Sequence, residues 1–197
     1  NPDPLTRAAE YLTYYLGRSE WEQALPQIAE LRKLQPDALE YVEQEFRIRL
    51  ALEQFREAEE LSGKLARYAD GQGFDRAGGA VYRGELALAQ NNADAAIREL
   101  RQAVNVLPKS DELQIKLAQG YWLGNRREEA LAALQQAVES NPRSFRAHFL
   151  LRQLYKELAA RSYGAESEEF KAKESESQAK AIELNPRDPQ VRAWKQE

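Results

Sequence analysis

Residues 111–144 place apolar and polar side chains in the order expected of two amphipathic helices. Leu113, Leu117 and Tyr121 recur every four residues, which puts them on one face of a helix. Gly124 and Asn125 interrupt this pattern. A second periodic run follows and consists of Ala130, Leu134, Ala137 and Val138, before Asn141 and Pro142. The stretch therefore predicts a helical hairpin of 34 residues.

The same hairpin pattern recurs along the chain. Copies aligned on their closing proline, which Asp70 replaces in the divergent second copy, start at Leu5, Leu39, Ala77, Asp111 and Phe145, at intervals of 34, 38, 34 and 34 residues. A fixed period of this length is the signature of a repeat architecture, in which each unit packs only on its neighbours. The sequence therefore predicts a stack of helical hairpins rather than a compact globule.

Residues 111–144 resemble a tetratricopeptide repeat. Seven of eight signature positions are filled, by Leu117, Ala118, Tyr121, Ala130, Leu134, Ala137 and Pro142. Only Gln114 departs, where the family prefers tryptophan. The resemblance implies an all-α fold, a right-handed α-solenoid that forms a single domain over residues 1–197. Its repeats are expected at about 5–38, 39–76, 77–110, 111–144 and 145–188, with a capping helix at 189–197.

Two interruptions break the period. Residues 70–74 add four residues after the second unit, and their glycines and aspartate predict a loop, either a hinge or a longer turn. In the fifth unit Pro186 follows Pro142 by 44 residues, ten more than the period. We expect both helices of that unit to be longer than usual, with a turn at residues 162–164.

Composition and net charge argue against several classes of protein. The chain is 43% hydrophobic and 30% charged, and no apolar run approaches the roughly 20 residues of a membrane-spanning helix. The net charge of −4 argues against a nucleic-acid binder, which needs a basic face. The lack of cysteine excludes disulfides but fits a reducing or an oxidising compartment. We expect a soluble protein, cytoplasmic or periplasmic, and the start at Asn1 is expected of a processed chain or an excised domain.

Few residues suit catalysis. His148 is the single histidine, so a multi-histidine metal site or a Cys–His dyad cannot form, and we expect it to pack between helices. Gly63 and Lys64 lack the upstream glycine of a phosphate loop, and Gly71 with Gly73 lacks the third glycine of a dinucleotide loop. No catalytic residue, metal site or cofactor is expected, and the chain is predicted not to be an enzyme.

The resemblance also implies a binding groove. In the family the first helices line a concave surface, and their second, fifth, ninth and twelfth positions face inward. These positions and their neighbours give the predicted groove residues Val81, Leu88, Ile115, Lys116, Gln119, Trp122, Arg146, Phe149, Gln153 and Lys156. Val81, Ile115 and Phe149 share one position in three successive units and predict an exposed apolar strip, with Trp122 as an anchor.

The groove predicts a function in protein binding. We expect a non-catalytic scaffold that holds a peptide or helix with apolar anchors, and with acidic flanks because Lys116, Arg146 and Lys156 border the strip. Two alternatives remain open. The chain could be the regulatory or substrate-recruiting part of a larger enzyme or assembly complex, or it could assemble with itself through the extended fifth unit.

Overall fold

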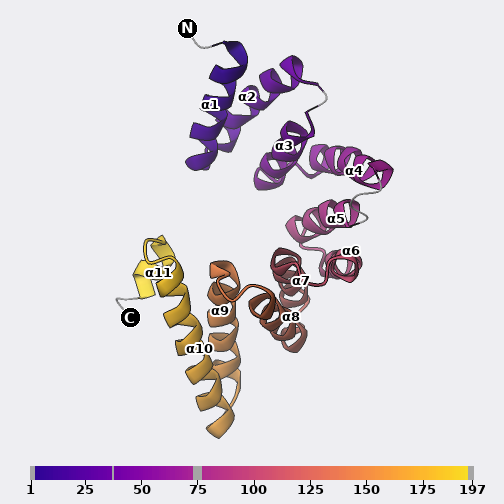
Figure 1. Ribbon diagram of the computed structural model, residues 1–197. Coiled ribbons are helices and arrows are strands. Elements are labelled where there is room, and N and C mark those ends of the chain that lie inside the picture. Colours follow the sequence, from indigo (N-terminus) through magenta and orange to yellow (C-terminus); the bar gives the residue numbers. More distant parts are fainter. Residues whose placement is uncertain (1–2, 37, 73–76, 195–197) are drawn as a thin grey trace. The chain divides into compact units, whose positions relative to one another are not determined.

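The computed structural model describes residues 3–36, 38–72 and 77–194, and all regular elements within these ranges are α-helices (Figure 1). The predicted all-α fold is therefore confirmed. The chain divides into two compact units, Asn1–Glu99 and Leu100–Glu197. The single domain over residues 1–197 remains a prediction.

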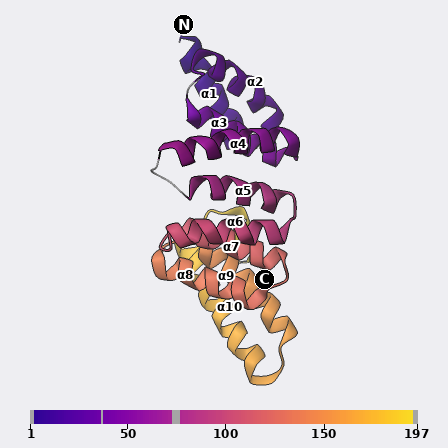
Figure 2. The same cartoon turned by 90° about the vertical axis from the view of Figure 1, so that its right-hand side faces the viewer.

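The helices follow the predicted hairpins closely (Figures 1 and 2). In the first unit they are α1 (Pro4–Gly17), α2 (Trp21–Leu34), α3 (Leu39–Ala51), α4 (Phe55–Gln72), α5 (Gly78–Ala89) and α6 (Ala93–Val106), the last of which continues into the second unit. In the second unit they are α7 (Asp111–Leu123), α8 (Arg127–Ser140), α9 (Phe145–Arg161), α10 (Gly164–Leu184) and α11 (Pro189–Trp194).

The turns inside the first four hairpins share one backbone conformation. Ser19, Glu53, Asn91 and Asn125 have positive φ angles of 57°, 56°, 57° and 61°, and each is the fifteenth residue of its repeat. The next residue donates its N–H back into the first helix, as in Arg126 N to Tyr121 O at 2.8 Å. Such a left-handed residue ends a helix and satisfies its last carbonyl groups. The second repeat, although divergent in sequence, therefore turns in register with the others.

Alanines on the second helices allow close packing inside the hairpins. Ala24, Ala58, Ala96 and Ala130 occupy the same position of four repeats, and each is 0% exposed. Larger side chains lie one turn further along, where Ile28, Leu100 and Leu134 are also fully buried. Burying each of these large side chains contributes on the order of 2 kcal/mol. The periodic small and large positions read from the sequence are thus the core of the hairpins.

The fifth hairpin is longer, as predicted. Helices α9 and α10 have 17 and 21 residues, whereas α7 and α8 have 13 and 14. The two long helices run side by side, and their extension is held by the Ser167 hydroxyl, which donates to Ala159 O at 2.9 Å. Phe170 also stacks on Tyr155 with ring centroids 6.2 Å apart. At the turn Tyr163 is 90% exposed.

The prediction of a loop at residues 70–74 is wrong for residues 70–72. Helix α4 continues through Gln72, so residues 70–72 are helical, and residues 73 and 74 lie outside the described ranges. The helix extends through an aspartate and a glycine because lengthening an existing helix costs far less than starting a new one.

Candidate functional site

A hollow lies between the first helices of the first two hairpins. Its volume is ≈ 510 Å³, and it is lined by Leu5, Thr6, Ala9, Glu10 and Thr13 from α1 and by Tyr41 from α3. The Thr13 hydroxyl donates to Ala9 O at 2.9 Å within α1. Tyr41 is buried, and burial followed by the neighbouring Glu40 raises the pKa of its phenol. The hollow therefore combines an apolar floor with a few polar groups.

A second hollow lies at the end of the second unit. It measures ≈ 300 Å³ and is lined by Phe145, Arg146 and Phe149 from α9 and by Asp188, Pro189 and Gln190 at the start of α11. Phe149 stacks on Trp194 with ring centroids 5.0 Å apart, and the Arg152 guanidinium lies 4.5 Å from the centre of the same indole. Helix α11 thus covers part of the last hairpin with Val191 and Trp194, which are both buried.

The two hollows are built from corresponding positions. Leu5, Thr6 and Ala9 are the first, second and fifth residues of the first repeat, and Phe145, Arg146 and Phe149 are the same residues of the fifth. Each hollow also lies between the first helix of one hairpin and the helix that starts the next. The face predicted to bind a partner is therefore open to solvent at one place in each unit.

The predicted groove residues have different surroundings. Val81, Leu88, Gln119, Trp122, Phe149 and Gln153 are half-buried, and Arg146 and Lys156 are exposed. Ile115 is only 3% exposed and lies in a core cluster with Ala118, Ala147 and Leu151. Lys116 is 8% exposed, and its Nζ donates to Glu112 Oε1 at 2.6 Å. Ile115 and Lys116 are thus buried side chains where an exposed position was expected, and the use of the groove in binding remains a prediction.

Trp122 is tied to the next hairpin by a carboxylate. Its indole Nε1 donates to Glu157 Oε2 at 2.9 Å, and Arg127 Nε donates to Glu157 Oε1 at 2.6 Å. Burial acts to raise the pKa of Glu157, but the hydrogen bonds from Arg127 and then Trp122 outweigh it, so the pKa of this carboxyl lies below its usual value. Trp122 therefore joins α7 to α9, whereas the sequence suggested only a partner anchor.

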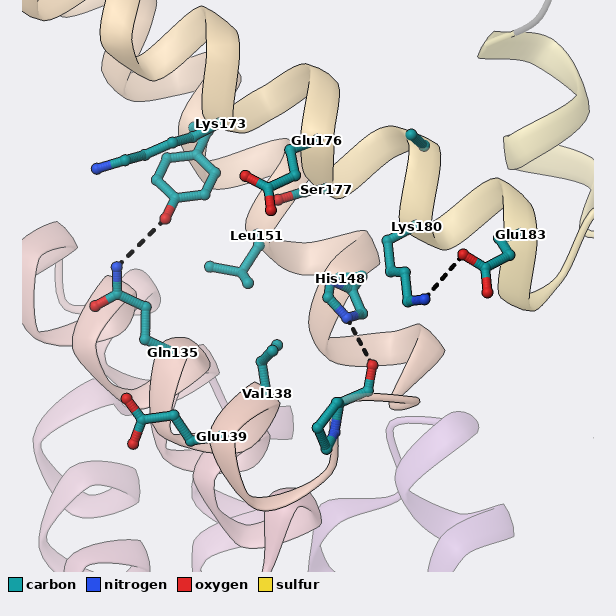
Figure 3. A pocket seen from close by; sticks show the side chains of 13 residues that line it. Gln135, Val138, Glu139, His148, Leu151, Lys173, Glu176, Ser177, Lys180 and Glu183 are labelled. Atoms are coloured by element: carbon teal, nitrogen blue, oxygen red, sulfur yellow. Dashed lines mark hydrogen bonds and ion pairs between the residues drawn. The ribbon is translucent and has the colours of Figure 1, made fainter.

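A larger groove, which the sequence pattern did not reveal, lies between α8 and α10 (Figure 3). It measures ≈ 920 Å³, its floor is formed by His148, Leu151 and Tyr155 of α9, and its α10 wall carries Lys173, Glu176, Ser177, Ala179, Lys180 and Glu183. Gln135, Val138, Glu139 and Pro142 form the opposite wall. His148 is half-buried here, and its Nε2 lies 3.0 Å from Pro142 O.

Neither a metal site nor a membrane span is found in the parts of the chain that the structure describes. Within residues 3–36, 38–72 and 77–194, no group of three His, Asp or Glu side chains is arranged to hold a metal ion. Over the same ranges no helix has both the length and the apolar character needed to cross a membrane.

Comparison with known proteins identifies the repeat. A sequence model of the tetratricopeptide repeat matches residues 87–155. None of the curated protein sequences matches the chain. The resemblance seen in residues 111–144 is thus confirmed by a match that includes them.

Solved structures share the fold over nearly the whole chain. TTC0263, a thermophilic protein of this repeat class from Thermus thermophilus, is 23% identical, with 97% of this chain and 94% of that chain covered and a TM-score of 0.74. A tetratricopeptide repeat protein from Parabacteroides merdae is 14% identical, with 96% and 68% covered and a TM-score of 0.77. YrrB, described as having an unusual peptide-binding site, is 17% identical, with 96% and 91% covered and a TM-score of 0.58. At these identities the likeness establishes the fold.

Proposed function

We propose that this chain, a tetratricopeptide repeat protein, is a non-catalytic scaffold that holds a segment of another protein against the first helices of its hairpins. The observation that carries the proposal is the pair of hollows at α1 and α9, which are lined by corresponding residues of two repeats. Stacked repeats present extended surfaces of this kind, and such surfaces are used for binding. YrrB, which shares the fold, is described as having a peptide-binding site.

The lining residues indicate what the segment contains. Leu5 and Ala9 in one hollow and Phe149 in the other offer apolar surface, which favours apolar side chains as anchors. Arg146 and Lys156 are exposed on α9, and their positive charge favours carboxylates beside an anchor at Phe149 of the same helix. We therefore propose a partner segment with apolar anchors and acidic flanks.

Site-specific photo-crosslinking tests this function. A photoreactive amino acid is placed at Thr6 or Arg146, which line the hollows, and at Gln23 or Gln136, which are exposed on the second helices α2 and α8. The first pair should yield a crosslink to one specific protein in the native source, which mass spectrometry then identifies. Equal labelling from the second-helix positions would contradict the proposal.

A purified complex provides the matching affinity measurement. Ala9→Arg fills the α1 hollow with a long charged side chain and should weaken binding of the identified partner about tenfold or more, since it removes a buried apolar contact. Gln23→Arg adds the same side chain on α2 and should leave the dissociation constant unchanged. Circular dichroism then tests whether both variants keep their helix content, which is expected to be unchanged.

A further inference from the structure

The groove between α8 and α10 has an ordered pattern of charge on one wall. Lys173, Glu176, Lys180 and Glu183 all line it from α10, at spacings of three, four and three residues. This spacing places them along a single face of the helix, over a length of about 15 Å. Figure 3 shows the four side chains along the α10 edge of the groove. The charges along this edge alternate in sign.

The alternating charges of one α10 match opposite charges on a second α10 that runs in the opposite direction. If a second α10 lies antiparallel with its centre at Gln178, Lys173 faces the partner's Glu183 and Glu176 faces the partner's Lys180. A two-fold axis repeats both pairs, so four opposite-charge pairs form. In a parallel arrangement each residue would instead face its own copy, and all four pairs would be like-charged. The pattern therefore selects one orientation.

We propose that the groove between α8 and α10 is the interface of a homodimer, in which the α10 of a second copy lies antiparallel beside this α10. The occupant is a second copy because the charged edge complements itself and because the groove beside that edge, at ≈ 920 Å³, can receive side chains of a neighbouring helix. This interface goes beyond the proposed capture of a partner on the first helices, with which it shares no lining residue.

The rest of the groove suits such a neighbour. Ala179, which is exposed, lies near the proposed axis, and a small side chain there lets two helix axes approach closely. Val138, Leu151 and Tyr155 supply apolar surface in the wall and floor. The alkyl chains of the partner's lysines can cover this surface while their ammonium groups stay in water.

The expected association is weak and depends on salt. Lys173 already pairs with Glu169 at 2.6 Å and Lys180 with Glu183 at 2.8 Å. Dimerisation therefore replaces these pairs within one helix by pairs between the two copies. Exposed ion pairs contribute little each and are screened by salt. We therefore expect a dimer that forms as the protein concentration rises and that dissociates as the ionic strength rises.

Charge reversal in sedimentation velocity tests the interface. The mass of the wild-type chain should rise from 22.5 kDa toward twice that value with concentration. Lys173→Glu alone or Glu183→Lys alone turns two attractive pairs into repulsive ones, and each should raise the dissociation constant on the order of tenfold. The double variant K173E/E183K restores opposite charges across the axis and should recover the wild-type constant.

The double variant separates the dimer contact from helix stability. Within one α10 it puts a negative charge at position 173 near Glu169 and a positive charge at position 183 near Lys180, so the local repulsion of both single variants persists. Recovery of the dimer can then come only from pairs between copies. The pair E176K/K180E repeats the design nearer the axis, and circular dichroism reports whether α10 stays folded.

Three outcomes would overturn the proposal. One is a wild-type chain that stays monomeric at every concentration and at low salt. Another is a dimer that survives Lys173→Glu unchanged, and the third is a folded double variant that remains monomeric. Lys171→Glu is the matched control, because Lys171 is exposed on α10, pairs with Glu168 at 2.7 Å and does not line the groove. This variant should dimerise like the wild type.

Discussion

Glu157→Gln should destabilise the second unit by about 1.5–3 kcal/mol, the range for hydrogen bonds to charged groups. The Glu157 side chain is 27% exposed and that of Arg127 is 13% exposed, with Arg127 Nη2 at 2.5 Å from Glu157 Oε1. Glutamine keeps the size of the side chain and can still accept from the Trp122 indole. It removes the negative charge, so the guanidinium of Arg127 is left in a mostly buried place without an opposite charge.

The free energy of unfolding that Glu157→Gln removes should depend on pH in one direction. The folded-state pKa of Glu157 lies below its usual value of 4.5, so the unfolded chain binds a proton at this residue more readily than the folded chain does. The stabilisation is therefore present above about pH 4.5 and is lost as the pH falls through the folded-state pKa. The stability gap between wild type and Glu157→Gln should be widest near neutral pH and should close in acid.

Urea unfolding followed by circular dichroism and tryptophan fluorescence measures this gap. Taking the difference between the two proteins at each pH removes the contribution of every other titrating group. Glu166→Gln is the matched control, because Glu166 is exposed in the first turn of α10, where loss of its attraction to the helix dipole should change stability by less than about 1 kcal/mol. Equal midpoints for wild type and Glu157→Gln at neutral pH, or a gap that widens in acid, would refute the reasoning.

Four further substitutions, one of them a control, test the hairpins and the cap. Glu53→Gly should stabilise the chain by about 1 kcal/mol in thermal unfolding, because φ of Glu53 is 56°, whereas Gln90→Gly, at φ −77°, should destabilise it by about 0.5–1 kcal/mol. Ala130→Leu should cost about 1–3 kcal/mol in urea unfolding, since Ala130 is 0% exposed. Trp194→Ala should speed hydrogen exchange in α11 but leave α7 unchanged, because the stack on Phe149 is lost.

The repeat architecture could be predicted because its causes are local. Proline and asparagine end the second helices, and alanine recurs where two helices approach, so the period is visible in single residues such as Ala130 and Pro142. The extension of α4 to Gln72 was missed for a related reason. Glycine and aspartate have low helix propensity, but a helix that already exists can include them.

The candidate site was only partly predictable because burial depends on residues far apart in sequence. Arg146 and Phe149, which the spacing on α9 places on one face, line a hollow. The sequence did not reveal that Glu157, 35 residues beyond Trp122, accepts its indole N–H. It also did not reveal that Ile115 is buried, since that depends on how closely α7 and α9 pack.

The charges of the chain divide into two groups by burial, and this division decides which of them can bind another molecule. Glu99 and Glu157 are mostly buried and accept from arginines of other helical segments, Arg83 at 2.8 Å and Arg127 at 2.6 Å, so they hold helices together. On the groove edge of α10, Lys173 and Lys180 form pairs within that helix, with Glu169 and Glu183, each pair contributing only about 0.2–0.5 kcal/mol. Because the fold loses little when these pairs are exchanged, they can meet a second copy. Lys173→Glu should therefore weaken dimerisation without altering crosslinking from Thr6 or Arg146, and a loss of both together would show that the two surfaces are not independent.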